Sequence, residues 1–193
     1  MAHVSIIGTG NMGQAIASVA GKGGHTVQLL GRDDAATAVT GDIVVLAVPY
    51  SAISQIVTAR AAGLAGKTVV DITNPLDFET FDSLMVPTDS SAAAEIAAML
   101  PDSVVLKAFN TTFAGTLAAG SVGPLTTTVL IAGDDAAAKS ELAAVLASGG
   151  LKAVDAGPLR RARELEAVGF LQLTLAANEK ISWTGGFGLV DQA

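Results

Sequence analysis

The stretch Val4-Ser5-Ile6-Ile7-Gly8-Thr9-Gly10-Asn11-Met12-Gly13 decides the fold of this chain. Its first four residues predict a buried strand, and a helix is expected from about Asn11 to Lys22. Between them, Gly8 permits a tight turn, Gly10 lets a pyrophosphate approach the backbone, and Gly13 lets the helix pack closely on the strand. The positive end of the helix dipole then faces the anion. The stretch therefore predicts dinucleotide binding, with a simple strand-to-helix connection as the alternative.

Composition narrows the class of protein. Half of the 193 residues are hydrophobic, the formal net charge is −7, and there is no cysteine. The acidic balance and the lack of a basic cluster argue against nucleic acid or an anionic membrane as partner. Without cysteine, and with only His3 and His25, we expect no disulfide, no thiolate catalysis and no metal site. With no leader pattern and no membrane-length apolar run, we expect a cytoplasmic protein.

Strand and helix patterns alternate along the whole chain. This alternation predicts an α/β fold, a doubly wound and mainly parallel sheet with helices on both faces. We expect one domain over residues 1–193, with a C-terminal helical extension over about 158–193. The predicted strands after the first are 25–30, 42–50, 68–72, 103–108, 126–132 and 151–155. The predicted helices after the first are 51–62, 90–100, 114–119, 136–146 and 160–179.

The end of the second predicted strand bears on the choice of nucleotide. Gly31 and Arg32 follow it, and an arginine here can make a bidentate contact to the 2′-phosphate of NADP. Asp33 is the rival, because a register shift of one residue would make it the ribose ligand of NAD. Arg32 as a plain solvated residue is the remaining alternative. We expect NADP.

Other strand ends should line the same crevice, because ligands bind at the carboxyl ends of strands in such sheets. The third predicted strand ends in Ala47-Val48-Pro49-Tyr50, where Tyr50 either stacks on the cofactor or caps the core. Asn74-Pro75 follows the next strand, and Asn74 either hydrogen-bonds the nicotinamide half or forms a turn. Residues 34–41 leave room for about two helical turns at most, so a stunted crossover is expected.

Four motifs together resemble the coenzyme F420-dependent NADP oxidoreductase family, and in particular its short bacterial dinucleotide-binding members. The motifs are the glycine turn, Ala47–Tyr50, Asp71–Leu76 and Lys107–Thr111, and the late stretch 157–166 fits as well. The resemblance covers essentially the whole chain. The cytoplasmic domains of membrane metalloreductases, which pass electrons from NADPH to flavin, are related to this family.

The resemblance implies a Rossmann-type fold and an oxidoreductase that passes hydride directly between nicotinamide and a flavin-like or deazaflavin (F420) ring. Positioning then replaces acid–base catalysis. By matching motifs, the cofactor-binding residues would be those of the turn, of the second and third strand ends, and of the Asn-Pro pair. They are Gly8, Thr9, Gly10, Asn11, Met12, Gly13, Gly31, Arg32, Ala47, Val48, Pro49, Tyr50, Asn74 and Pro75. Phe109, Asn110 and Thr111 would bind the acceptor, and C-terminal helices would help form a homodimer.

The chain departs from the family in two places. The family usually has Gly-Ser-Arg after the second strand, whereas this chain has Leu30-Gly31-Arg32, so one phosphate-binding hydroxyl is missing. The shortened crossover also alters the adenine side of the site.

Other functions stay open on the sequence. A reductase of a small carbonyl or imine would need a proton donor, for which the sole tyrosine, Tyr50, is the candidate. A dinucleotide-binding protein without turnover is a third possibility. In the long last helix, Leu165, Val168, Leu171 and Leu175 either pack on the sheet or form a dimer contact.

Overall fold

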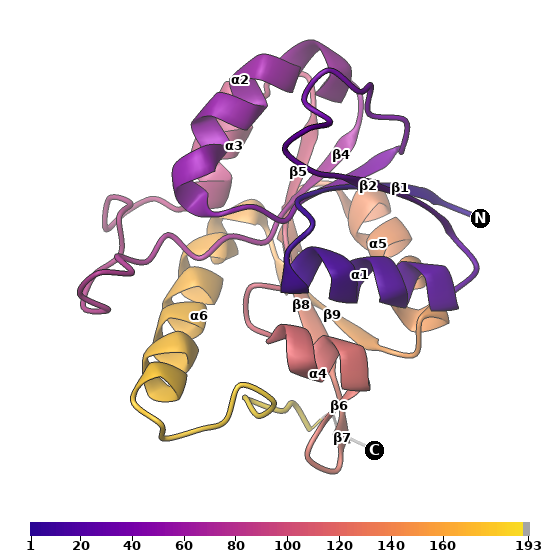
Figure 1. Cartoon of the computed structure of the whole chain (residues 1–193). Helices are drawn as coiled ribbons and strands as arrows, with labels where there is room; N and C mark the ends of the chain where they lie inside the picture. The colour runs from indigo at the N-terminus through magenta and orange to yellow at the C-terminus, as the bar shows by residue number, and fades with distance from the viewer. Residues whose placement is uncertain (191–193) are drawn as a thin grey trace.

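The computed structural model describes residues 1–190, and the end of the predicted C-terminal extension, residues 191–193, lies outside this part. A seven-stranded sheet in the order β2-β1-β3-β4-β5-β8-β9 forms the centre (Figure 1). Its strands are β1 (His3–Ile7), β2 (Thr26–Leu30), β3 (Ile43–Leu46), β4 (Thr68–Asp71), β5 (Val104–Lys107), β8 (Thr128–Gly133) and β9 (Lys152–Gly157). The first five strands are parallel, β8 is antiparallel to β5, and β9 is parallel to β8. The predicted doubly wound, mainly parallel sheet is confirmed.

The described part of the chain contains six α-helices. They are α1 (Asn11–Lys22), α2 (Ile53–Leu64), α3 (Ala92–Met99), α4 (Ala114–Ala119), α5 (Ala136–Ser148) and α6 (Ala162–Ala177). The 3-10 turns η1 (Tyr50–Ala52) and η2 (Leu159–Arg161) precede α2 and α6, and a small hairpin joins β6 (Ser121–Val122) to β7 (Leu125–Thr126). None of the helices within residues 1–190 is long and apolar enough to cross a membrane.

Alternate side chains of the central strands point into two hydrophobic cores, one on each face of the sheet. Ile43 and Val45 of β3 join the core under α1, α4 and α5, while Val44 and Leu46 join the core under α2 and α3. All four are buried, so β3 is apolar on both faces, as parallel strands covered by helices must be. Figure 1 shows the two helical layers on opposite sides of the sheet.

The order in which the chain adds strands to the sheet reverses between β1 and β3. The chain passes from β1 to β2 on one side, and then returns to place β3 on the other side of β1. Such a switch point leaves a crevice at the carboxyl ends of the two strands. The glycine turn follows β1 and Ala47–Pro49 follow β3, so both border this crevice. The connection between β2 and β3 contains turns and no helix, in agreement with the short crossover predicted over residues 34–41.

Several predicted details were wrong. The third strand ends at Leu46 rather than Tyr50, because Pro49 precedes a 3-10 turn. The β6–β7 hairpin was not predicted. In α6, Leu165 is buried, but Val168 and Leu171 are 37% and 51% exposed. The buried stripe of α6 consists of small and polar residues as well as Leu165, namely Ala162, Glu166, Gly169, Gln172 and Ala176. Packing of all four apolar positions on the sheet is therefore excluded.

Candidate functional site: two cavities beside the glycine turn

The glycine turn is held by backbone contacts that exclude side chains. A Cβ atom on Gly8, whose φ is +120°, would overlap the backbone oxygen of Ala47, and one on Gly13 would overlap the backbone oxygen of Gly8. Gly10 differs, since a Cβ there would meet nothing within 4 Å. Gly8 and Gly13 thus permit the close packing of β1, β3 and α1, while Gly10 leaves open space above the backbone.

The first turn of α1 is suited to an anion. Its N-cap is Gly10, which makes no side-chain capping hydrogen bond, and no acidic residue lies in the first turn. The first amide groups of a helix have no partner within the helix, and the dipole there is positive. A phosphate above Gly10 would meet these amides without a clash, so the residues present fit a pyrophosphate.

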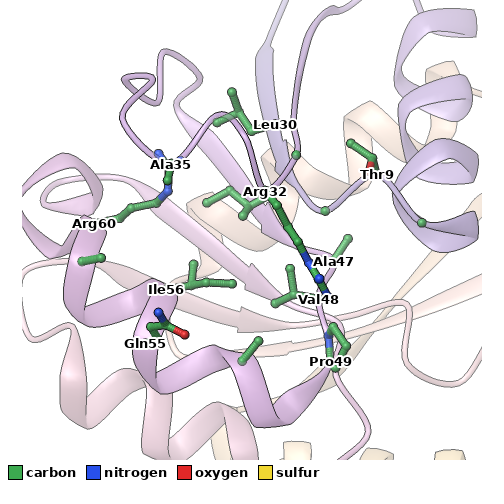
Figure 2. Close-up of a pocket in the computed structure, with 16 residues that line it drawn as sticks. Thr9, Leu30, Arg32, Ala35, Ala47, Val48, Pro49, Gln55, Ile56 and Arg60 are labelled. Atoms are coloured by element: carbon green, nitrogen blue, oxygen red, sulfur yellow. The ribbon is translucent and has the colours of Figure 1, made fainter.

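A cavity of about 660 Å³, here called the first cavity, opens beside this turn (Figure 2). Most of the residues predicted to bind the cofactor line this cavity, and they come from the segments that follow β1, β2 and β3. The predicted residues in its lining are Gly8, Thr9, Gly10, Gly31, Arg32, Ala47, Val48 and Pro49. The lining residues that sequence reasoning missed are Ile7, Leu30, Ala35, Ala52, Gln55, Ile56, Ala59 and Arg60.

Arg32 and Asp33 are separated by the structure. Both side chains are exposed, but only Arg32 lines the first cavity. The next residue, Asp34, accepts a hydrogen bond at Oδ2 from the amide of Gly31 (2.8 Å). This bond closes the turn after β2 and leaves Arg32 as the charged side chain from this turn that borders the cavity.

Arg60 of α2 is a second arginine beside the first cavity. Its guanidinium donates to the backbone oxygens of Asp34 (2.6 Å) and Thr37 (2.8 Å) and so braces the shortened β2–β3 connection. Figure 2 shows its side chain reaching from α2 toward the segment that carries Ala35. Arg60 lies four residues after the half-buried Ile56, and residues at this spacing share a helix face. This spacing was the signal in the sequence that could have placed Arg60 beside Ile56 at the cavity.

A second cavity of about 480 Å³ also borders the turn. Four predicted residues line it: Asn11, Met12, Asn74 and Asn110. Ile72 and Thr112–Gly115 also line it, together with Leu173 of α6 and the C-terminal residues Trp183 and Thr184. Sequence reasoning missed these residues. The only signal for Trp183 was that it is the single tryptophan of the chain.

Asn74 and Asn110 hold the ends of β4 and β5 together at the second cavity. Asn110 Nδ2 donates to Asn74 Oδ1 (2.9 Å) and to the backbone oxygen of Leu165 (2.8 Å). Asn74 Nδ2 donates to the backbone oxygen of Asn110 (2.9 Å). A Cβ on Gly169 would overlap Asn74 Oδ1, so only glycine lets α6 approach so closely. Asn110 Oδ1 is buried and has no hydrogen-bond partner among the described residues.

The remaining predicted residues lie outside both cavities. Phe109 is 1% exposed, with its side chain in the core and its backbone in the left-handed region (φ 64°). Thr111 borders a separate small cavity near the β6–β7 hairpin. Pro75 is buried and accepts a backbone hydrogen bond from Met85 (2.6 Å). Gly13 lies beneath the turn.

Tyr50 also lies outside the lining of the two cavities. Its hydroxyl donates to Glu95 Oε2 at 2.5 Å, and its ring packs against the core under α2 and α3. Burial, and then the Glu95 carboxylate, raise the pKa of the Tyr50 hydroxyl above its usual value. Of the two roles considered for Tyr50, the structure therefore places it at the core.

A buried ion cluster lies at the carboxyl ends of β4 and β5. Lys107 Nζ contacts Asp71 Oδ2 (2.7 Å), Glu166 Oε1 (2.8 Å) and the backbone oxygen of Thr73 (2.6 Å). Glu166 accepts hydrogen bonds from the first amides of α3, at Ala92 and Ala93. Burial raises the pKa of the Glu166 carboxyl, and the nearby Lys107 ammonium opposes part of that effect. The cluster thereby connects α6, α3 and the sheet.

Comparison with known proteins identifies the relatives of this chain. The family model for "NADP oxidoreductase coenzyme F420-dependent" matches residues 28–75. The F420-dependent NADP reductase of Methanocaldococcus jannaschii is 30% identical over 168 residues, which cover 84% of this chain and 74% of that protein. Metalloreductase STEAP3 of Rattus norvegicus is 36% identical over 105 residues, which cover 54% of this chain but only 20% of that protein.

Solved structures extend the likeness to the whole chain. A putative F420-dependent NADP reductase from Arthrobacter sp. FB24 superposes with a TM-score of 0.84 at 27% identity, covering 97% of this chain and 99% of the other. An imine reductase of Streptomyces aurantiacus, at 20% identity and a TM-score of 0.62 over 92% of this chain and 63% of its own, shares the fold alone. By its identity to the Methanocaldococcus protein over most of both lengths, the chain belongs to the F420-dependent NADP reductase family of NAD(P)-dependent oxidoreductases.

Proposed function

We propose that this protein transfers hydride directly between NADPH and a deazaflavin (F420) or flavin ring. One observation carries the proposal: consecutive residues of the glycine turn line different cavities. Thr9 and Gly10 line the first cavity, and Asn11 and Met12 line the second. A dinucleotide whose pyrophosphate lies on the turn can therefore place one half in each cavity. Family membership supports the same pair of substrates.

The two halves of the nucleotide would meet different residues. In the first cavity, Arg32 is positioned for the 2′-phosphate. Val48 and Pro49 form an apolar border of this cavity. In the second cavity, both polar ends of the Asn74 amide are used by Asn110. The unpaired Oδ1 of Asn110 is the acceptor we assign to the nicotinamide carboxamide, because a buried acceptor gains most from a ligand donor.

The lining of the second cavity suits hydride transfer between rings. Bound NADPH supplies a hydride as its C4–H bond breaks, the acceptor ring gains a C–H or N–H bond and a proton from water, and NADP⁺ remains. Within the described part of the chain, no residue of this lining has an acidic, basic or phenolic side chain. The chain would then act by aligning the two rings and excluding water. Reduction of a carbonyl or imine needs a proton donor, and the Tyr50 hydroxyl is bonded to Glu95 instead.

The test is NADPH oxidation at 340 nm with F420, FMN or FAD as acceptor, together with loss of the acceptor's own visible band. We expect stoichiometric reduction of at least one ring. Tight NADPH binding with no oxidation by any of these acceptors would favour the non-catalytic binding protein instead. Turnover with a small imine, lost in Tyr50→Phe, would favour the imine reductase.

We also propose that residues 1–193 form one cytoplasmic domain that assembles as a homodimer. Val168 and Leu171 on the outer side of α6 supply exposed apolar surface for such a contact. Light scattering on the purified protein would give a mass near twice that of one chain. A Val168→Lys, Leu171→Lys variant should give the mass of one chain, and an unchanged mass would place the contact elsewhere.

A further inference from the structure

Among residues 1–190, none with a charged side chain lines the second cavity. Its polar groups are the amides of Asn11, Asn74 and Asn110 and the hydroxyls of Thr112 and Thr184. The first cavity, in contrast, has two arginines, Arg32 and Arg60. An anionic group placed in the second cavity would leave water without gaining a cationic partner, which costs free energy. The net charge of −7 adds a further unfavourable field.

Aromatic side chains form one wall of this cavity. The rings of Phe113 and Trp183 have centroids 5.1 Å apart at an interplanar angle of 53°. Phe113 is 7% exposed, whereas Trp183 is 53% exposed, so the indole retains free surface at the cavity. Ring faces of this kind stack on flat aromatic ligands.

In Figure 1, the C-terminal segment after α6 runs back toward α4. A Cβ atom on Gly115 of α4 would lie 3.0 Å from Thr184 Cγ2 and 3.1 Å from the Trp183 backbone oxygen, so the segment packs directly on α4. Beyond it, the amide of Phe187 donates to Oε1 of the buried Gln172 (3.3 Å). Trp183 and the residues after it are therefore packed against α4 and α6.

We propose that the second cavity selects the hydride acceptor by its ring alone, with Trp183 as the stacking surface, and leaves the anionic tail of the acceptor in solvent. The inference rests on the proposed function. F420 and FMN both carry a phosphate, whereas riboflavin and 7,8-didemethyl-8-hydroxy-5-deazariboflavin present the same rings without one. The compound that lacks the phosphate in each pair is then as good an acceptor as the phosphorylated one.

The first test compares kcat/KM at saturating NADPH within two pairs of acceptors: riboflavin with FMN, and 7,8-didemethyl-8-hydroxy-5-deazariboflavin with F420. We expect values within about threefold in each pair and little dependence on salt, because no ion pair forms. A preference of more than tenfold for the phosphorylated compound would overturn the inference while leaving the proposed function intact. Absence of turnover with all four would instead count against the proposed function.

The second test measures binding without turnover. Trp183 is the only tryptophan, so its fluorescence reports this wall alone. With NADP⁺ saturating, riboflavin and FMN should quench it with similar dissociation constants, after correction for absorption with free N-acetyltryptophanamide. No quenching by either compound would overturn the assignment of Trp183.

Substitution separates stacking from structure. Trp183→Leu should raise the KM for either acceptor by about tenfold with little change in the KM for NADPH, and Trp183→Phe should restore most of the loss. An equal effect on both KM values, or no difference between Leu and Phe, would show that Trp183 does not stack on the acceptor.

Discussion

The side chains of Asn74 and Asn110 form a reciprocal pair, in which each amide nitrogen donates at 2.9 Å to an oxygen of the other residue. The pair ties the turns after β4 and β5 together at the second cavity. It also leaves Asn110 Oδ1 as a buried acceptor without a partner in residues 1–190. The arrangement has both a structural and a ligand-binding consequence, and each can be measured.

Asn110→Ala should destabilise the fold by about 1–3 kcal/mol, because the buried Leu165 carbonyl and the partly buried Asn74 Oδ1 both lose a donor. Urea denaturation gives the free energy of unfolding. Asn178→Ala is the control, since its amide makes one exposed bond to Thr174. Equal effects of the two substitutions would show that the buried pair is not special.

Gly10→Ala should abolish or greatly weaken NADPH binding while leaving the fold intact. A methyl group at Gly10 meets no protein atom within 4 Å, so it enters only the space assigned to the pyrophosphate. The matched control is Gly21→Ala in α1, which also meets nothing and should bind normally. Calorimetric titration and thermal melting measure the two effects. Normal NADPH binding by Gly10→Ala would remove the phosphate from this turn.

Arg32→Ala should weaken NADPH binding by about 1–3 kcal/mol and leave NADH binding unchanged, because only the 2′-phosphate loses a charge-assisted bond. Asp33→Ala, next in the chain and outside the cavity lining, should change neither. If Asp33→Ala instead weakened NADH binding, Asp33 would be the ribose ligand and the assignment to NADP would reverse.

Glu166→Gln should flatten part of the pH dependence of stability. Burial raises the pKa of Glu166, so its contribution is fully present below its unfolded value of about 4.5 and decreases as pH rises through the folded value. Glutamine keeps an oxygen for the Ala92 amide and removes the titration. Wild type should therefore lose stability relative to the variant as pH rises above 4.5.

Denaturation curves between pH 4 and 8 measure this difference. Asp155→Asn is the control of opposite sign, because the Lys139 hydrogen bond lowers the pKa of Asp155 and its contribution is lost only as pH falls. Its difference from wild type should stay constant above pH 5. Parallel curves for wild type and Glu166→Gln would contradict the effect assigned to the buried carboxyl.

Local signals in the sequence predicted local structure well. The helix over Asn11–Lys22 has the predicted bounds because glycines flank it at Gly10 and Gly23. The helix over Ala114–Ala119 also has its predicted bounds, because Gly120 adopts the left-handed conformation and ends it. Half of the residues that line the first cavity were also predicted, since the carboxyl ends of parallel strands must meet at one edge of the sheet.

Features set by distant contacts could not be predicted in this way. Val168 and Leu171 follow helical spacing, yet α6 turns its small and polar side inward because Gly169 must pass over Asn74. Phe109 follows a strand end, but its ring fills the core. Trp183 reaches the second cavity only because the C-terminal segment folds back onto α4. None of these placements follows from propensity or periodicity.

The most direct test of the central claim is transfer of deuterium from NADPH labelled at C4 of the nicotinamide to F420. Hydride passed directly between rings forms a C–H bond at C5 of the deazaflavin, and a hydrogen on carbon does not exchange with water. With one of the two C4 epimers, mass spectrometry should find one deuterium in the reduced F420. Unlabelled reduced F420 from both epimers, with the label lost to water, would contradict direct transfer.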